Sequence, residues 1–164
     1  MRNIIVHTDG SSNKDKTLCG WAFVISDENK EVVHIEKGSQ GGTHNVGELL
    51  GILNAMKYCY NVHGRTIKSL HIYSDSQYCV DPIYYGTLDT WKMNGWTRSD
   101  GEPTKNCELW KEIDFMLTQF KRKGITLDVQ WVRGHNKNVL NEIADKHAVE
   151  ARTNFIQNDK FKKF

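Results

Sequence analysis

Four carboxylates in this sequence occupy positions from which a fold could bring them together. Asp9 and Asp75 each end a run in which β-branched residues alternate with others, the pattern of a strand that stops at the acid. Glu48 lies near the start of a predicted helix on the same face as apolar Ile52, and Asp145 lies on the last predicted helix. Crowded carboxylates repel one another and favour a hard divalent cation, so the sequence predicts a magnesium site.

Two such ions would give this cluster the chemistry of a nuclease, because they can generate a hydroxide and stabilise the leaving oxygen of a phosphodiester. Each acid also has a purely structural interpretation. Asp9 before Gly10 could form an Asx turn. Asn45 and Glu48 could form a capping box, and Asp145 could simply face solvent. Only the combination of the four acids favours the metal site.

Hydrophobic periodicity divides the chain into strands and helices of ordinary length. Alternating residues predict strands over residues 3–9, 19–26, 31–36, 69–75 and 126–132. Apolar residues at helical spacing predict helices over residues 45–60, 76–83, 106–121 and 139–152. The polar and aromatic segment 87–105 leads into the third of these helices.

The order β-β-β-α-β-α-α-β-α predicts an α/β domain with a mixed sheet, an antiparallel meander at one side and helices on its faces. The chain of 164 residues has the length of one domain, which we place at residues 1–152. Residues 153–164, rich in lysine and phenylalanine, are expected to form a flexible tail that could contact nucleic acid or a protein partner.

Composition limits the function classes without choosing among them. The net charge of +2 is too small to establish a nucleic-acid partner. Apolar stretches fall far short of the roughly 20 residues that cross a bilayer, and no signal-peptide pattern opens the chain, so we expect a cytoplasmic protein without membrane contact. The four cysteines are dispersed and favour neither a zinc site nor a disulfide framework.

Short motifs along nearly the whole chain, in order and approximate spacing, resemble those of type 1 ribonucleases H. The matching segments are Thr8-Asp9-Gly10-Ser11, Thr43 to Leu49, Ser74 to Tyr78, Trp91 to Trp96, Lys105 to Trp110, Trp131 to His135 and Asn141 to Asp145. This resemblance implies a ribonuclease H-like mixed five-stranded sheet flanked by helices. It also implies an endonuclease that hydrolyses the RNA strand of RNA–DNA hybrids and leaves 5′-phosphate and 3′-hydroxyl ends.

The resemblance assigns a role to each acid. Asp9, Glu48, Asp75 and Asp145 would bind two Mg²⁺ ions, for which Mn²⁺ could substitute, and Asp9 would bridge both. Asp145 would help to hold the ion that activates water, whereas Glu48 and Asp75 would hold the ion at the leaving 3′ oxygen. His135 would assist proton transfer or product release, a task that its ordinary pKa of about 6.5 suits. Considered alone, His135 could equally be an exposed bystander.

The resemblance also implies residues that bind the hybrid. Asn45 and Gln77 would reach its minor groove, where the 2′-hydroxyl distinguishes RNA from DNA. Thr43 and Asn106 would bind a DNA phosphate, although both could instead cap helices.

Trp91 and Trp96 belong to a segment that resembles the family's substrate-binding protrusion, with fewer basic residues than many members carry. Tyr84 and Tyr85 replace an obvious tryptophan before it, and His44 stands where an amide residue is common.

Rival functions remain open from the sequence. One is a magnesium nuclease of the same broad superfamily that acts on DNA, and another is a non-catalytic module that binds hybrids or double-stranded RNA. A structural interaction domain is the third. The complete set of acids with His135 favours the hybrid nuclease, which we expect to be a monomer.

Overall fold

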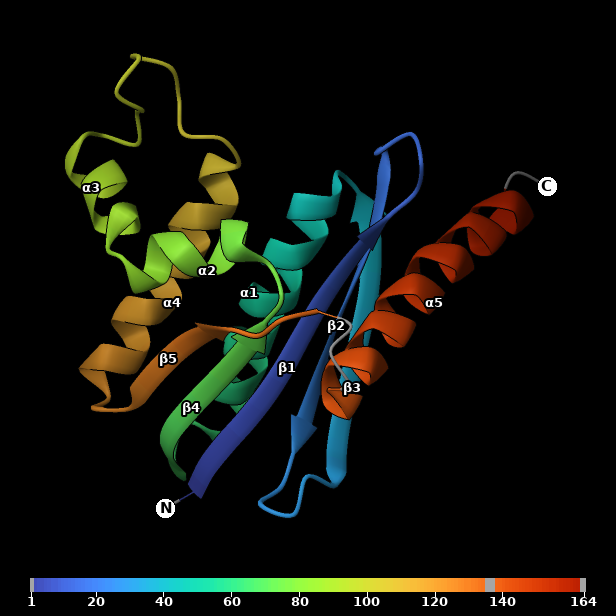
Figure 1. The fold of residues 1–164 in the computed structure, drawn as a ribbon, viewed down its shortest axis with the longest axis horizontal. Coiled ribbons are helices and arrows are strands. Elements are labelled where there is room, and N and C mark those ends of the chain that lie inside the picture. The colour runs from blue at the N-terminus through green and yellow to red at the C-terminus, as the bar shows by residue number, and fades with distance from the viewer. Residues whose placement is uncertain (1, 135–137, 163–164) are drawn as a thin grey trace.

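A mixed five-stranded sheet in the order β3-β2-β1-β4-β5 forms the centre of the molecule (Figure 1). The computed structural model describes residues 2–134 and 138–162, with side chains described up to residue 154. The predicted α/β class is confirmed. The strands are β1 (Arg2–Ser12), β2 (Leu18–Ser26), β3 (Val32–Gly41), β4 (Ile67–Ser74) and β5 (Thr126–Trp131).

The central strand β1 divides the sheet into an antiparallel half and a parallel half. It pairs antiparallel with β2, which pairs antiparallel with β3, so the predicted meander is confirmed. On its other side β1 pairs parallel with β4, and β4 pairs parallel with β5. The parallel register ends where Thr8 lies opposite Ser74. Asp9 and Asp75 therefore each come directly after this last pair, on two neighbouring segments of the sheet.

Helices cover both faces of this sheet (Figure 1). α1 packs on β1 and β2 and contacts α4, and the main hydrophobic core lies between these helices and the sheet. α5 packs on the opposite face against β1, β2 and β3, over a small cluster that contains Val24, Leu140 and Ala144. The helices are α1 (His44–His63), α2 (Gln77–Tyr84), α3 (Thr87–Met93), α4 (Cys107–Arg122) and α5 (Val139–Lys162). In the described part of the chain, no helix combines the length and apolarity needed to cross a bilayer.

Strand β1 extends further than the sequence predicted. The predicted end of this strand at Asp9 is wrong, because the antiparallel ladder with β2 continues to Ser12. The turn follows directly, where Oδ1 of Asn13 accepts a hydrogen bond of 3.0 Å from the N–H of Thr17. Asp9 thus lies inside a paired strand that fixes its backbone, and the interpretation of Asp9 as a turn residue is wrong.

Two helices also differ from the prediction. α3 lies within segment 87–105 and buries only Leu88, so its sequence carries too short an apolar pattern to reveal a helix. α5 continues past Arg152 to Lys162, since neither proline nor glycine follows to end it. The flexibility of the C-terminal tail stays a prediction.

Close contact between β1 and α1 depends on glycine. A Cβ atom at Gly10 would lie 2.3 Å from the backbone nitrogen of Glu48 and 2.4 Å from the carbonyl carbon of Gly47. A Cβ atom at Gly47 would in turn lie 2.7 Å from the carbonyl oxygen of Gly20. Because glycine has no side chain, α1 can approach the sheet closely at Glu48.

We predict that Gly10→Ala destabilises the protein by roughly 1–3 kcal/mol, because the added methyl group must push α1 away from β1. Gly41→Ala is the matched control, since a methyl group there meets nothing closer than 3.6 Å. Urea unfolding of the two variants measures the difference. Equal unfolding midpoints for Gly10→Ala and Gly41→Ala would contradict the close contact between β1 and α1.

Candidate active site

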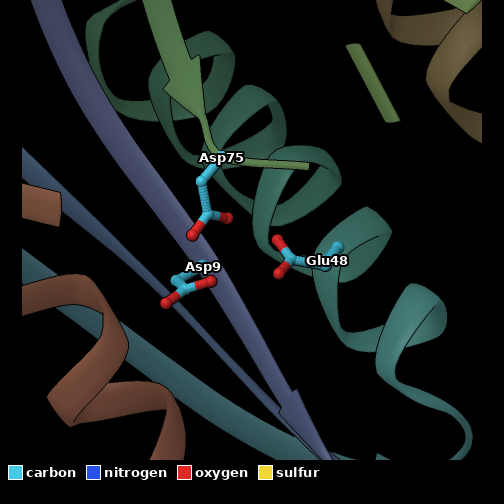
Figure 2. Close-up of side chains that lie close together, drawn as sticks. All are labelled: Asp9, Glu48 and Asp75. Atoms are coloured by element: carbon cyan, nitrogen blue, oxygen red, sulfur yellow. The ribbon is translucent and has the colours of Figure 1, made fainter. Parts of the chain in front are cut away.

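Three carboxylates from separate elements converge beside the central strand, where β4 ends (Figure 2). Asp9 projects from β1, Glu48 from α1, and Asp75 from the residue that follows β4. One carboxylate oxygen of each residue lies within 4.8 Å of the others. The structure thus brings together three of the four acids that the sequence predicted as metal ligands.

Asp145 faces the same cluster from α5. It lines a cavity of about 230 Å³ together with Asp9, Glu48 and Asp75. His44, an exposed residue, is also part of the wall of this cavity. The predicted fourth acid therefore borders the site, although it lies outside the tight group of three.

The start of α1 explains how Glu48 comes to point into the cavity. Thr43 is the N-cap residue, and its hydroxyl accepts a hydrogen bond of 3.3 Å from the N–H of Val46. Asn45 is consequently a helical residue rather than the cap, so the capping-box interpretation of Glu48 is wrong. The Glu48 side chain lies on the buried face of the helix and is free to meet Asp9.

Burial makes the negative charges of Asp9 and Glu48 costly, because only 4% of Asp9 and 1% of Glu48 is exposed. Loss of hydration, followed by the charges of Glu48 and Asp75, raises the pKa of Asp9 far above its usual range. Loss of hydration and the charge of Asp75 likewise raise the pKa of Glu48. A cation between these groups would offset both effects.

The cluster fits a hard divalent cation. Its donors are carboxylate oxygens, which Mg²⁺ prefers. The Oε2 atom of Glu48 is buried and has no hydrogen-bond partner within the described residues. A cation would supply that partner and neutralise the repulsion among the acids. Asp9, Glu48 and Asp75 are thus the residues that could hold a metal ion, and Asp145 lines the same cavity.

Two contacts at the site were missed from the sequence. The Nε2 atom of His44 lies 3.1 Å from Oε1 of Glu48, one helical turn away. The indole N–H of Trp131 donates a hydrogen bond of 3.1 Å to the carbonyl oxygen of Asp75. The sequence signals for these contacts were the i,i+4 spacing of His44 and Glu48 and the position of Trp131 at the end of β5.

The predicted hybrid-binding residues lie at the starts of helices. Asn45 is in the first turn of α1, and Gln77 is the first residue of α2, directly after Asp75 and Ser76. Thr43 caps α1, so its capping interpretation is confirmed. Binding of the hybrid by these residues stays a prediction.

Asn106 precedes α4 with a left-handed backbone, at φ 58°. Its side chain donates a hydrogen bond of 2.9 Å to the Tyr78 hydroxyl instead of capping the helix, so the capping interpretation is wrong for this residue. The bond ties Asn106 to α2, whereas its predicted contact with a DNA phosphate stays a prediction.

Trp91 and Trp96 are partly buried and pack against the main core. The Trp91 ring meets Trp110 edge to face, with 5.4 Å between ring centroids. Trp91 therefore helps to hold α3 to the domain and Trp96 the segment after it, and their substrate contact stays a prediction. His135 lies outside the described residues, so its predicted catalytic role stays a prediction as well.

Comparison with known proteins decides the family. The family model for RNase H matches residues 1–153. The chain belongs to the RNase H family. The predicted enzyme class, a ribonuclease H hydrolase, is thereby confirmed.

Relatives named Ribonuclease H span almost the same length. The protein from Treponema denticola is 32% identical over 160 residues, which cover 91% of this chain and 96% of the relative. The protein from Wolbachia pipientis wMel is 32% identical over 152 residues, which cover 92% of this chain and 95% of the relative.

Solved structures share the fold of this family member. LC11-RNase H1 in complex with an RNA/DNA hybrid superposes with a TM-score of 0.71 at 19% identity, over 93% of this chain and 99% of the other. LC9-RNase H1 superposes with a TM-score of 0.75 at 24% identity, over 93% of this chain and 72% of the other.

We predict that Asp9→Asn stabilises the metal-free protein at neutral and alkaline pH. The folded pKa of Asp9 is raised, so its stabilising contribution is present below its ordinary pKa of about 4 and is lost as the pH rises through the folded value. Removing the charge should raise the melting temperature by several degrees at pH 8, at roughly 2–4 °C per kcal/mol, and by little at pH 4.

The measurement is the melting temperature of variant and parent protein in EDTA from pH 4 to pH 9, read as the difference between them. Asp15→Asn serves as the control, because Asp15 is an exposed turn residue. Addition of Mg²⁺ should stabilise the parent protein more than Asp9→Asn. A difference that stays constant with pH would contradict the raised pKa.

Proposed function

We propose that this protein hydrolyses the RNA strand of RNA–DNA hybrids with two Mg²⁺ ions and leaves 5′-phosphate and 3′-hydroxyl ends. One observation carries the proposal. Three carboxylates, two of them buried, converge from β1, α1 and β4 with a carboxylate oxygen of each within 4.8 Å of the others. Such a cluster is costly to maintain without cations, so its retention in a stable fold is best explained by metal-dependent phosphodiester chemistry.

Asp9, Glu48, Asp75 and Asp145 are the proposed ligands. When bound, the two ions supply an activated water and stabilise the leaving oxygen. The protein contributes a rigid frame, because Asp9 lies in a paired strand and Glu48 on a helix packed closely against that strand. The Trp131 indole anchors the backbone of Asp75. Three of the proposed ligands are thus positioned by β1, α1 and the end of β4, and α5 carries the fourth.

The hybrid is the proposed substrate. Asn45 and Gln77 lie in the first turns of α1 and α2, next to Glu48 and Asp75, where they can meet the strand that is cut. The RNA/DNA hybrid bound by LC11-RNase H1, which shares this fold, supports the same substrate for this chain. Thr43 and Asn106 provide neutral donors for a phosphate of the partner strand.

Two of the three basic side chains between the start of α3 and the start of α4 are paired within the protein, whereas the third, Lys105, is exposed. Lys92 on α3 forms an ion pair of 3.0 Å with Asp114 on α4, and Arg98 forms one of 3.3 Å with Asp100. These basic side chains are engaged within the protein. We therefore propose that positioning at the helix starts contributes more to substrate binding than the protrusion does.

We predict that the protein cleaves only the RNA strand of an RNA–DNA hybrid and that this cleavage requires a divalent metal ion. Four matched labelled substrates, an RNA–DNA hybrid, an RNA duplex, a DNA duplex and single-stranded RNA, are incubated with Mg²⁺ or with EDTA. Only the RNA strand of the hybrid should be cut, and only with Mg²⁺. Cleavage of DNA would favour a DNA nuclease, and binding without cleavage would favour a non-catalytic module.

Asp75→Asn should reduce cleavage of the hybrid by more than a hundredfold, because it removes a metal ligand while keeping the size of the side chain. Asp27→Asn is the control, since Asp27 lies in the turn after β2 at the opposite end of the sheet. Circular dichroism confirms that both variants fold. Normal cleavage by Asp75→Asn would show that the site assignment is wrong.

His135→Ala should slow turnover without abolishing it, because assistance with proton transfer typically contributes about 10²–10⁴-fold to a rate. Single-turnover and multiple-turnover rates of hybrid cleavage separate a role in the chemical step from one in product release. A variant with no residual activity would contradict this auxiliary role.

A further inference from the structure

A second cavity, of about 710 Å³, lies on the α5 face of the sheet, where the start of α5 leaves part of β1 and β4 uncovered. Its volume is in the range of small-molecule sites. Ile5, Val139 and Leu140 give it apolar walls. It shares no lining residue with the carboxylate cavity, so it needs an explanation of its own.

Two deeply buried polar side chains line this cavity without a partner. His7 is 6% exposed and Ser26 is 4% exposed. Within the described residues, neither Nδ1 of His7 nor the hydroxyl of Ser26 has a hydrogen-bond partner. Buried polar atoms are normally satisfied, because an unmade hydrogen bond in a protein interior is costly. Their position on adjacent strands of the cavity wall therefore points to a ligand that supplies the missing bonds.

The rest of the wall indicates the shape and charge of that ligand. The rings of His7 and Tyr73 stack, with centroids 5.1 Å apart and planes 23° apart, and so provide an aromatic surface. Lys30 contributes a cationic side chain from the turn between β2 and β3. Within the described part of the chain, no carboxylate pairs with it at salt-bridge distance.

We propose that this cavity binds a small planar aromatic anion. Its ring lies against the apolar and aromatic walls, its polar edge exchanges hydrogen bonds with His7 and Ser26, and its anionic group pairs with Lys30. The ring, the polar edge and the anionic group of the ligand each complement one observed property of the cavity wall. The binding site is separate from the proposed hydrolytic site and does not need a divalent ion.

The test uses two probes in EDTA, indole-3-acetate and adenosine 5′-monophosphate, which share an aromatic ring and an anion but differ in carboxylate and phosphate. Isothermal titration calorimetry measures affinity, and the ring signals of isotope-labelled histidine, assigned with His7→Phe, report the place of binding. We expect at least one probe to bind with a submillimolar Kd and to shift the His7 signals. Indole, which lacks the anion, and cyclohexylacetate, which lacks the aromatic ring, should bind at least tenfold more weakly.

Variants separate this site from nonspecific binding. Ser26→Ala and Lys30→Gln should each weaken the better probe at least fivefold. Lys16→Gln is the matched control, because Lys16 and Lys30 are both turn residues with positive φ, at 57° and 64°, and it should leave the affinity unchanged. The proposal would be overturned if neither probe bound with a Kd below 1 mM, if Ser26→Ala or Lys30→Gln bound the better probe as tightly as the parent protein, or if the His7 signals did not shift. None of these outcomes depends on hybrid cleavage.

Discussion

Repulsion among buried carboxylates is the constraint around which this structure is arranged. Asp9 and Glu48 are almost completely buried, and their raised pKa values reflect lost hydration and the proximity of Asp75. A flexible chain would relieve that repulsion by moving the groups apart. Here the central strand, the glycine contact with α1 and the Trp131 hydrogen bond prevent the movement. The fold therefore holds these acids together, and either proton uptake, which the raised pKa values favour, or a bound cation would relieve their repulsion.

Much of the fold could be predicted from the sequence because the relevant signals are local. Alternation located all five strands, and turn residues located most of their ends. The ends of β1 and β3 and the short helix α3 could not be found in this way, since β3 continues to Gly41 beyond the predicted end at residue 36. The ladder with β2 extends β1 through Gly10, and α3 is held by tertiary packing rather than by its own apolar face.

The residues of the site could be predicted from the sequence, but the contacts among their side chains could not. The resemblance named the acids, and the structure gathers three of them closely, with Asp145 in the wall of the same cavity. The contact of His44 with Glu48 and the hydrogen bond of Asn106 to Tyr78 depend on side-chain directions that no sequence spacing specifies. Capping rules also failed for Asn106, because its backbone takes a left-handed conformation before α4.

The engaged charges of Lys92 and Arg98 have a consequence for how the enzyme responds to its ionic surroundings. Each phosphate that a free lysine or arginine neutralises releases counterions, so affinity for nucleic acid falls with rising salt in proportion to the number of such contacts. With Lys92 and Arg98 paired to Asp114 and Asp100, Lys105 is the one basic residue between the starts of α3 and α4 that has no ion pair among the described residues. A duplex that contacted this segment would release few counterions there, so its binding would depend only weakly on ionic strength.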